Sequence, residues 1–208
     1  MLDGINLSQK IRNTMHPQPL IRLTPEQYLH RERLAETKSE YFDGEIFAMA
    51  GASREHNQIA ANLVRVLGNQ LLEKPCSVYS NDMKVKIEKA KKYTYPDVVV
   101  ACQSECFEDE QRDVLLNPVV ILEILSNSTE AYDRGKKFLH YQLLGSLVDY
   151  LLVSQDTPRI EIFSRCHDQT WLYAEFHGLD AVVNLESIGC QLRLGEIYHK
   201  VNLQESLE

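Results

Sequence analysis

The fold of this chain is decided by the stretch Pro118-Val-Val-Ile-Leu-Glu123-Ile-Leu125, which is apolar except for one carboxylate. A second run of the same kind, Tyr93-Thr-Tyr-Pro96-Asp97-Val-Val-Val100, precedes it and also holds one acid. Short β-branched runs of this composition are typical of central strands that are buried on both faces of a sheet. The sequence therefore predicts two central strands, each with a carboxylate in an apolar setting.

Helix signals surround these two strands. Thr24-Pro25-Glu26 predicts a capped helix that runs to about Ala35, and Ser53 predicts the cap of a helix with apolar residues at Ile59, Leu63, Leu67 and Leu71. A third helix is expected from Tyr132 to Leu144, where Gly145 ends it. These helices alternate with strands, which indicates a mixed α/β architecture.

Further strands are predicted by apolar or alternating residues, and a tight turn is predicted at Asp43-Gly44. The expected strands lie at 45–50, 76–87, 148–153, 159–163 and 170–176. Residues 1–22 contain two prolines and show no period, so they predict an N-terminal arm. We expect one domain over residues 23–208, built on a central mixed β-sheet flanked by helices.

Composition excludes several classes of protein. The chain has 208 residues, 44% of them hydrophobic and 25% charged, which is ordinary for a globular domain and excludes disorder and coiled coil. No apolar run approaches the ~20 residues that span a bilayer, and the N-terminus shows no secretory signal. We expect a soluble, cytoplasmic protein whose five irregularly spaced cysteines are reduced thiols.

The charge balance is acidic, with 22 Lys and Arg against 30 Asp and Glu, a net charge of −8. Nucleic-acid-binding domains usually carry an excess of basic residues. Five lysines nevertheless crowd residues 84–92. This run is either a solvated hairpin or edge strand, protected by its charge, or a track for phosphates.

Asp97 and Glu123 need partners, because a carboxylate buried in an apolar strand is costly unless it is paired or bound to a metal. If the two strands lie side by side, their oxygens form a site for Mg²⁺ or Mn²⁺. The alternative is that Asp97 caps a turn after Pro96 and that Glu123 pairs with a nearby cation.

Two further residues are placed to serve such a site. Asp133, Lys137 and Tyr141 share one face of the third helix, so Lys137 can reach back to the strand ends and stabilise charge on a phosphate. The alternative is an ordinary Asp133–Lys137 salt bridge. His56 lies in the first turn of the second helix, where it either faces the same cleft or is a surface or capping histidine. No P-loop, GxGxxG, HExxH or GxSxG motif is present, and no aromatic stacking platform stands out.

Six ordered motifs resemble the bacterial "putative restriction endonuclease" family, formerly a domain of unknown function, within the PD-(D/E)xK nuclease superfamily. They are Leu23-Thr-Pro-Glu-x-Tyr28, Glu40-Tyr-x-Asp-Gly-Glu45-Ile, Ala50-Gly-Ala-Ser-x-x-His56-Asn, Tyr95-Pro-Asp97-Val, Glu123-Ile-Leu-Ser126-x-Ser-Thr129 and Tyr132-Asp-Arg-Gly-x-Lys137-Phe-x-x-Tyr141. The resemblance covers about residues 23–163.

The resemblance implies a restriction-endonuclease-like fold and a magnesium-dependent endonuclease acting on DNA. By this likeness Asp97 and Glu123 match the metal-binding acids, and Lys137 matches the lysine of the family. The chain departs from the superfamily pattern at Leu125, where the (D/E)xK element has lysine. Glu45 and His56 match further positions near the expected cleft.

The same likeness leaves other functions open. One is a catalytically inactive DNA-binding or assembly module that retains the nuclease fold, which an ammonium of Lys137 turned away from both acids would favour. Another is a hydrolase of small phosphodiesters, which needs a closed pocket. Superfamily members that cut both strands commonly act as dimers, so we expect a homodimer.

Overall fold

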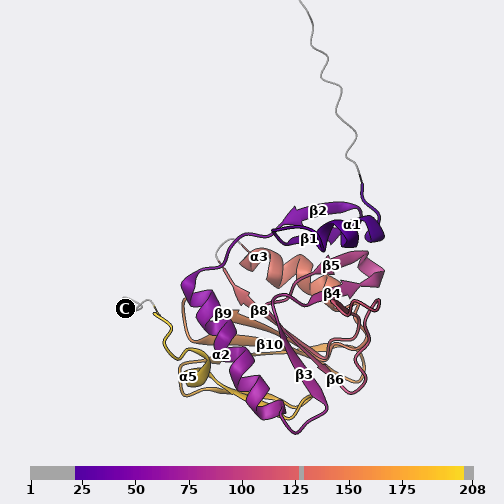
Figure 1. Ribbon diagram of the computed structural model, residues 1–208. Coiled ribbons are helices and arrows are strands. Elements are labelled where there is room, and N and C mark those ends of the chain that lie inside the picture. Colours follow the sequence, from indigo (N-terminus) through magenta and orange to yellow (C-terminus); the bar gives the residue numbers. More distant parts are fainter. Residues whose placement is uncertain (1–21, 127–128, 204–208) are drawn as a thin grey trace, which may run out of the picture.

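The computed structural model describes residues 22–126 and 129–203 (Figure 1). Its helices are α1 (Pro25–Glu32), α2 (Arg54–Leu71), α3 (Glu130–Tyr132), α4 (Phe138–Tyr141) and α5 (Leu194–Ile197), with a 3₁₀ turn η1 (Glu88–Ala90) and a π-helical segment η2 (Asp133–Lys137). The strands are β1 (Ser39–Phe42), β2 (Glu45–Ala48), β3 (Cys76–Ser80), β4 (Lys84–Ile87), β5 (Lys92–Thr94), β6 (Val98–Cys102), β7 (Val114–Leu115), β8 (Val120–Leu125), β9 (Asp149–Ser154), β10 (Arg159–Arg165), β11 (Trp171–His177), β12 (Val182–Leu185) and β13 (Cys190–Arg193).

The central element is a six-stranded mixed sheet of order β11-β10-β9-β8-β6-β3. Only β8 and β9 pair in parallel within it, and the other neighbours are antiparallel. α2 crosses one face of this sheet, and the segment that begins with α3 lies on the other (Figure 1). The predicted mixed sheet flanked by helices is therefore confirmed.

The structure contains a second sheet that the sequence did not predict. It has five strands in the order β2-β1-β5-β4-β7, and its β1–β2 hairpin lies above α3 in the view of Figure 1. α1 packs on its outer face through Tyr28, against Tyr41 and Tyr93. The predicted single strand over 76–87 is wrong, since a turn at 81–83 divides it into β3 of the first sheet and β4 of the second.

The two faces of the six-stranded sheet carry separate cores, as the alternation of β8 shows. Leu122 and Ile124 pack toward α2, while Ile121 and Leu125 pack toward α4 and the second sheet. Glu123 stands between Ile121 and Leu125 on the second face, among apolar neighbours. The C-terminal hairpin β12–β13 and α5, which the sequence did not predict, complete the core beneath α2.

Local sequence signals account for the elements that hold the site. The Thr24 side chain accepts from the Gln27 amide in a capping box, and the Ser53 hydroxyl accepts from the His56 amide at the start of α2. Asp43 and Gly44 form the predicted hairpin turn, both with positive φ, and a Cβ on Gly44 would lie 2.9 Å from that of Arg22.

The expectation of reduced cysteines is wrong for one pair, and the lysine run forms the expected hairpin, β4–β5, but is solvated only in part. Cys76 and Cys102 form a disulfide, because the β3–β6 register places them directly opposite each other, a pairing that spacing alone does not reveal. Lys84 and Lys92 of the lysine run are buried rather than solvated, because they pair with acids from other segments. The predicted arm lies outside the described residues except for Arg22. No helix among the described residues is long and apolar enough to cross a membrane.

Candidate functional site

Asp97 and Glu123 lie directly opposite each other on the same face of the six-stranded sheet. The antiparallel register pairs Val98 with Leu122 and Val99 with Ile121, so one step further it opposes Asp97 to Glu123. Directly paired residues project to the same side of a sheet. The two acid-bearing segments therefore lie side by side, which was the condition that the sequence set for a shared metal site.

Asp97 precedes β6 and is held at one carboxylate oxygen. Its Oδ2 accepts the backbone N–H of Ile124 at 2.7 Å and lies 3.2 Å from Nε2 of His56. The two side chains are 12% exposed for His56 and 17% for Asp97. His56 therefore lies beside Asp97 and is not a surface histidine. The Ser53 cap fixes the backbone of His56 at the start of α2.

Glu123 is more deeply buried, with its side chain 4% exposed. Its Oε1 lies 2.8 Å from Nζ of Lys137 and accepts a 2.7 Å hydrogen bond from the Tyr141 hydroxyl. Burial raises the pKa of Glu123 to about 8, and the negative charges of Asp97 and Asp133 act in the same direction while Lys137 opposes them. One lysine and one tyrosine from the facing helix offset only part of the cost of this charge, so the pKa of Glu123 stays above its ordinary value.

Lys137 reaches the strand ends because the predicted continuous α-helix contains the π-helical segment η2. Besides Glu123, its Nζ lies 3.3 Å from Asp133 and 4.0 Å from Glu40. Burial opposes the charge of Lys137, but these three carboxylates raise its pKa well above the ordinary value. The Asp133–Lys137 salt bridge and the reach toward Glu123 therefore coexist.

Glu40 joins Asp97, Glu123, Asp133 and Lys137 in what we call the acidic cluster. It was not among the site residues predicted from the sequence. It projects from β1 toward Lys137, pairs through Oε2 with Nζ of Lys92 at 3.3 Å, and accepts a hydrogen bond from the Thr94 hydroxyl. Lys92 is only 1% exposed. The available signal was alternation, since Tyr41 is buried on the opposite face of the strand.

Glu45 is not brought into this cluster. It lies across from Phe42 in the β1–β2 hairpin, and the ion pair recorded for it in the described part of the chain joins it to Arg22 at 4.0 Å. Its side chain is 43% exposed. Of the five predicted site residues, the structure thus gathers Asp97, Glu123, Lys137 and His56.

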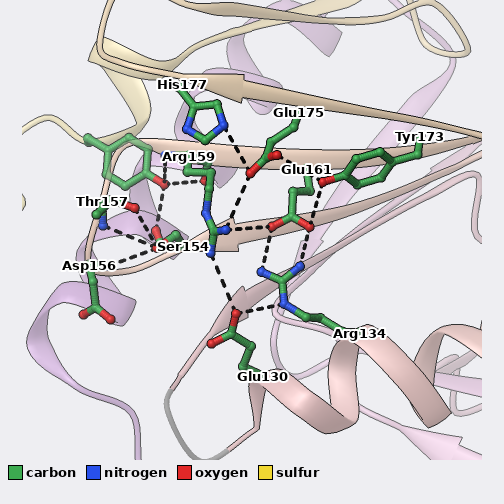
Figure 2. A network of polar contacts seen from close by, with 11 residues as sticks. Glu130, Arg134, Ser154, Asp156, Thr157, Arg159, Glu161, Tyr173, Glu175 and His177 are labelled. Atoms are coloured by element: carbon green, nitrogen blue, oxygen red, sulfur yellow. Dashed lines mark hydrogen bonds and ion pairs between the residues drawn. The ribbon is translucent and has the colours of Figure 1, made fainter.

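A second polar network anchors the helical segment that carries Lys137 (Figure 2). Arg134 forms a bidentate pair with Glu161 of β10, with Nη2 2.7 Å from Oε1, and its Nε donates to Glu130 at 2.8 Å. Figure 2 shows Glu161 between the guanidinium groups of Arg134 and Arg159, with Glu175 beyond Arg159. Glu161 is 3% exposed, so Arg134 ties η2 to the interior of the sheet.

The charges around Glu123 would not cancel if every group were ionised. Four carboxylates (Glu40, Asp97, Glu123 and Asp133) lie with two ammonium groups (Lys92 and Lys137), so full ionisation leaves −4 + 2 = −2. Among the described residues no three His, Cys, Asp or Glu side chains converge as a ready metal cluster. The residues present still fit a magnesium ion, which typically takes one or two carboxylates and completes its shell with water.

A comparison with protein-family models covers all the residues of this candidate site. A family model described as "Putative restriction endonuclease", Uma2, matches residues 25–195. The chain belongs to the Uma2 family. The match covers every element of the cluster, from β1 with Glu40 to η2 with Lys137.

Two relatives and one solved structure are similar to the chain over most of its length. Two uncharacterized proteins of Synechocystis sp. (strain ATCC 27184 / PCC 6803 / Kazusa) are 37% and 36% identical over 180 and 161 residues, which are 86% and 77% of this chain and 93% and 91% of theirs. The crystal structure of a putative nuclease belonging to DUF820 from Anabaena variabilis ATCC 29413 aligns with a TM-score of 0.70 at 20% identity, over 85% of this chain and 97% of that one. The Uma2 chain therefore has the fold of that protein.

Proposed function

We propose that this Uma2 protein is a magnesium-dependent endonuclease that hydrolyses phosphodiester bonds in DNA. The observation that carries the proposal is the direct opposition of Asp97 and Glu123 on one sheet face, with the ammonium of Lys137 2.8 Å from Glu123. Two opposed acids, with a lysine in contact with one of them, are the groups needed to hold a divalent cation and to stabilise charge on a phosphate.

Asp97 and Glu123 are the residues that would hold the cation. Hydrogen bonds from the described residues reach Oδ2 of Asp97 and Oε1 of Glu123, which leaves the second oxygen of each carboxylate for a ligand. A divalent cation at these carboxylates would offset the negative charge that ionisation of Glu123 adds to the cluster. When bound, the ion supplies a water nucleophile at neutral pH and Lewis-acid stabilisation of the phosphate.

Lys137 and His56 have separate tasks in this proposal. The buried ammonium of Lys137 contributes a fixed positive charge next to the scissile phosphate, and its carboxylate partners keep it protonated. His56 orients Asp97 by donating through Nε2 to Oδ2. Leu125, which stands where the superfamily pattern has lysine, packs in the core beside α4, so the helix supplies the cation instead of the strand.

The catalytically inactive module remains the alternative. Its distinguishing sign would be an ammonium of Lys137 turned away from the acids, whereas Nζ contacts both Glu123 and Asp133. This contact favours the nuclease. A homodimer stays an expectation taken from the superfamily, since cutting both strands of a duplex requires two centres, and light scattering of the purified chain measures it.

The test is cleavage of plasmid, single-stranded and branched DNA in Mg²⁺, Mn²⁺ or EDTA. We expect metal-dependent cutting that Asp97→Asn and Glu123→Gln each reduce below detection. Asp156→Ala, which removes an exposed acid from the neighbouring β9–β10 turn, is the matched control and retains activity. Absence of cutting on every substrate, with no metal binding by the folded wild type, would support the inactive module.

A further inference from the structure

Three exposed aromatic side chains lie beside the acidic cluster. Phe42 follows Glu40 by two residues on β1, and Phe47 on β2 is the direct cross-strand partner of Glu40, so both rings project from the face that carries Glu40. Phe47 is 50% exposed and Phe42 is 39% exposed. Tyr132, at the end of α3, is 38% exposed.

Tyr132 is tied to the cluster by a short chain of contacts. Its hydroxyl accepts a hydrogen bond from Nζ of Lys92, which also lies 4.9 Å from the centre of the tyrosine ring. The same ammonium pairs with Glu40, and Glu40 lies 4.0 Å from Nζ of Lys137. The exposed ring is therefore held from beneath by a buried cation, at a fixed place next to the centre.

A lysine and a histidine lie close to these rings along the helical segment. Lys136 and His140 follow Tyr132 at intervals of four residues, and the His140 ring packs on Phe42 in a tilted arrangement with ring centres 5.2 Å apart. Lys136 is exposed and forms no ion pair with any described residue. Burial and the charges of Lys92 and Lys136 lower the pKa of His140 while Glu40 opposes them, so Lys136 and not His140 is the exposed positive group of this segment at neutral pH.

We propose that Phe42, Phe47 and Tyr132 form a base-stacking surface that holds unpaired nucleotides of a single-stranded or frayed nucleic acid beside the Asp97–Glu123 centre, with Lys136 contacting the backbone. Exposed rings with intervening cations are the means by which proteins bind single strands, because each unpaired base offers a face for stacking. The bases of an intact duplex are stacked on one another and offer no such face. The choice of a nucleic acid as the ligand rests on the proposed nuclease function.

The experiment measures binding without cleavage. The full chain carrying Asp97→Asn is titrated in EDTA against a fluorescein-labelled 15-nucleotide thymidine strand and a 15-base-pair duplex, and fluorescence anisotropy gives each affinity. We expect the single strand to bind more tightly than the duplex. Tyr132→Ala and Phe47→Ala should each weaken single-strand binding by about 5- to 100-fold.

Two further variants separate stacking from folding. Tyr132→Phe keeps the ring and loses only the hydroxyl, so it should bind the single strand like its parent. Leu172→Ala removes an apolar side chain that is 64% exposed on the edge strand β11 and should leave binding unchanged. Thermal unfolding of every variant establishes that the compared proteins are folded.

Several results would overturn the base-stacking surface. They are equal affinity for strand and duplex, no single-strand binding, or folded Tyr132→Ala and Phe47→Ala variants that bind like the parent. A change of oligomeric state in these variants without a change in binding would assign the surface to a second copy of the chain. Because this assay requires no catalysis, binding as expected by a chain that never cuts would refute the nuclease alone.

Discussion

Lys137 neutralises charges that three elements bring together: Glu40 on β1, Glu123 on β8 and Asp133 at the start of η2. A charge in this position has a structural and a chemical consequence. Removing one partner of a buried pair is strongly destabilising, because the other charge is left uncompensated. The catalysis that we propose and the stability of the fold involve the same ammonium group, so the two effects must be measured separately.

Lys137→Met is expected to lower cutting by about 10²- to 10³-fold, the usual effect of losing a group that stabilises transition-state charge. Metal affinity should not fall with it, because the cluster without the ammonium is more negative. Calorimetry with Mn²⁺ and single-turnover cleavage measure the two effects, with the exposed Lys89→Met as the control. A parallel loss of metal binding and cutting in the folded variant would contradict the role given to Lys137.

Asp113 provides a residue-scale prediction of pH dependence. Hydrogen bonds from Arg33 and the charge of Lys84 lower the pKa of Asp113 to about 2. A folded-state pKa below the unfolded value of 3.8 gives stability that is complete above pH 4 and is lost as the pH falls through about 2. After screening at this partly exposed site it amounts to about 1 kcal/mol.

The check compares wild type with Asp113→Asn by urea unfolding. The difference in the free energy of unfolding should be largest at pH 6 and should shrink by roughly half at pH 3. A difference that stays constant between these pH values would show that the loss comes from packing and not from the charge of Asp113.

At the scale of elements, the decisive feature is the segment from α3 through η2 to α4. Its π-helical turn brings Lys137 to Glu123, while Arg134 ties the same turn to Glu161. π-helical turns are energetically poor and frequent at functional sites, so they need such tertiary contacts. Glu161, which anchors η2, and Glu123 of the candidate site lie in one row across neighbouring strands, because the register pairs both of them with Leu152.

Arg134→Ala is expected to loosen this segment, because it removes both charge-assisted bonds to a buried carboxylate. The free energy of unfolding should fall by roughly 3 kcal/mol, and amide hydrogen exchange over residues 130–141 should accelerate. Arg134→Lys should recover little, because an ammonium cannot form the bidentate pair. The surface variant Arg31→Ala is the control, and unchanged exchange over 130–141 in Arg134→Ala would refute the anchoring role.

How much the sequence could predict differs between elements. β8 and the capped α2 followed from composition and period. The predicted strand over 93–100 is only partly correct, because its first part belongs to β5 of the second sheet and its second part to β6. Asp97, Glu123 and His56 could still be proposed as neighbours, with a surface or capping role open for His56. Glu40 could not, because its partner Lys92 is distant in sequence and the lysine run resembles a solvated hairpin. Neither the π-helical turn nor the exposure of Phe42, Phe47 and Tyr132 has a local signal, because both depend on the packing of the second sheet.

At the scale of the whole molecule, the site lies where two sheets and two helical segments meet. The six-stranded sheet contributes Asp97 and Glu123, the five-stranded sheet contributes Glu40, α2 contributes His56, and η2 contributes Lys137. The net charge of −8 is therefore no obstacle to a nuclease, since much of the acidity surrounds the centre or is paired with lysine. Long-range steering of a nucleic acid should be weak, and local contacts should determine binding.

The disulfide gives a prediction at this scale, because it joins two strands of the six-stranded sheet. Cys76→Ser with Cys102→Ser should lower the free energy of unfolding by about 3 kcal/mol, in line with a cross-link that spans 26 residues. Cleavage by the folded double variant should be unchanged. Intact-mass analysis after alkylation under denaturing conditions checks the bond, and five modified cysteines in the unreduced protein would contradict it.

The central claim is that Asp97 and Glu123 together hold a divalent cation. The most direct measurement is an anomalous difference map from crystals soaked in Mn²⁺ and collected near the manganese absorption edge. We expect a peak about 2.1 Å from one oxygen of each carboxylate, and this peak should disappear in Glu123→Gln crystals. A map with no peak between these two side chains, from crystals in which Mn²⁺ is bound elsewhere, would contradict it.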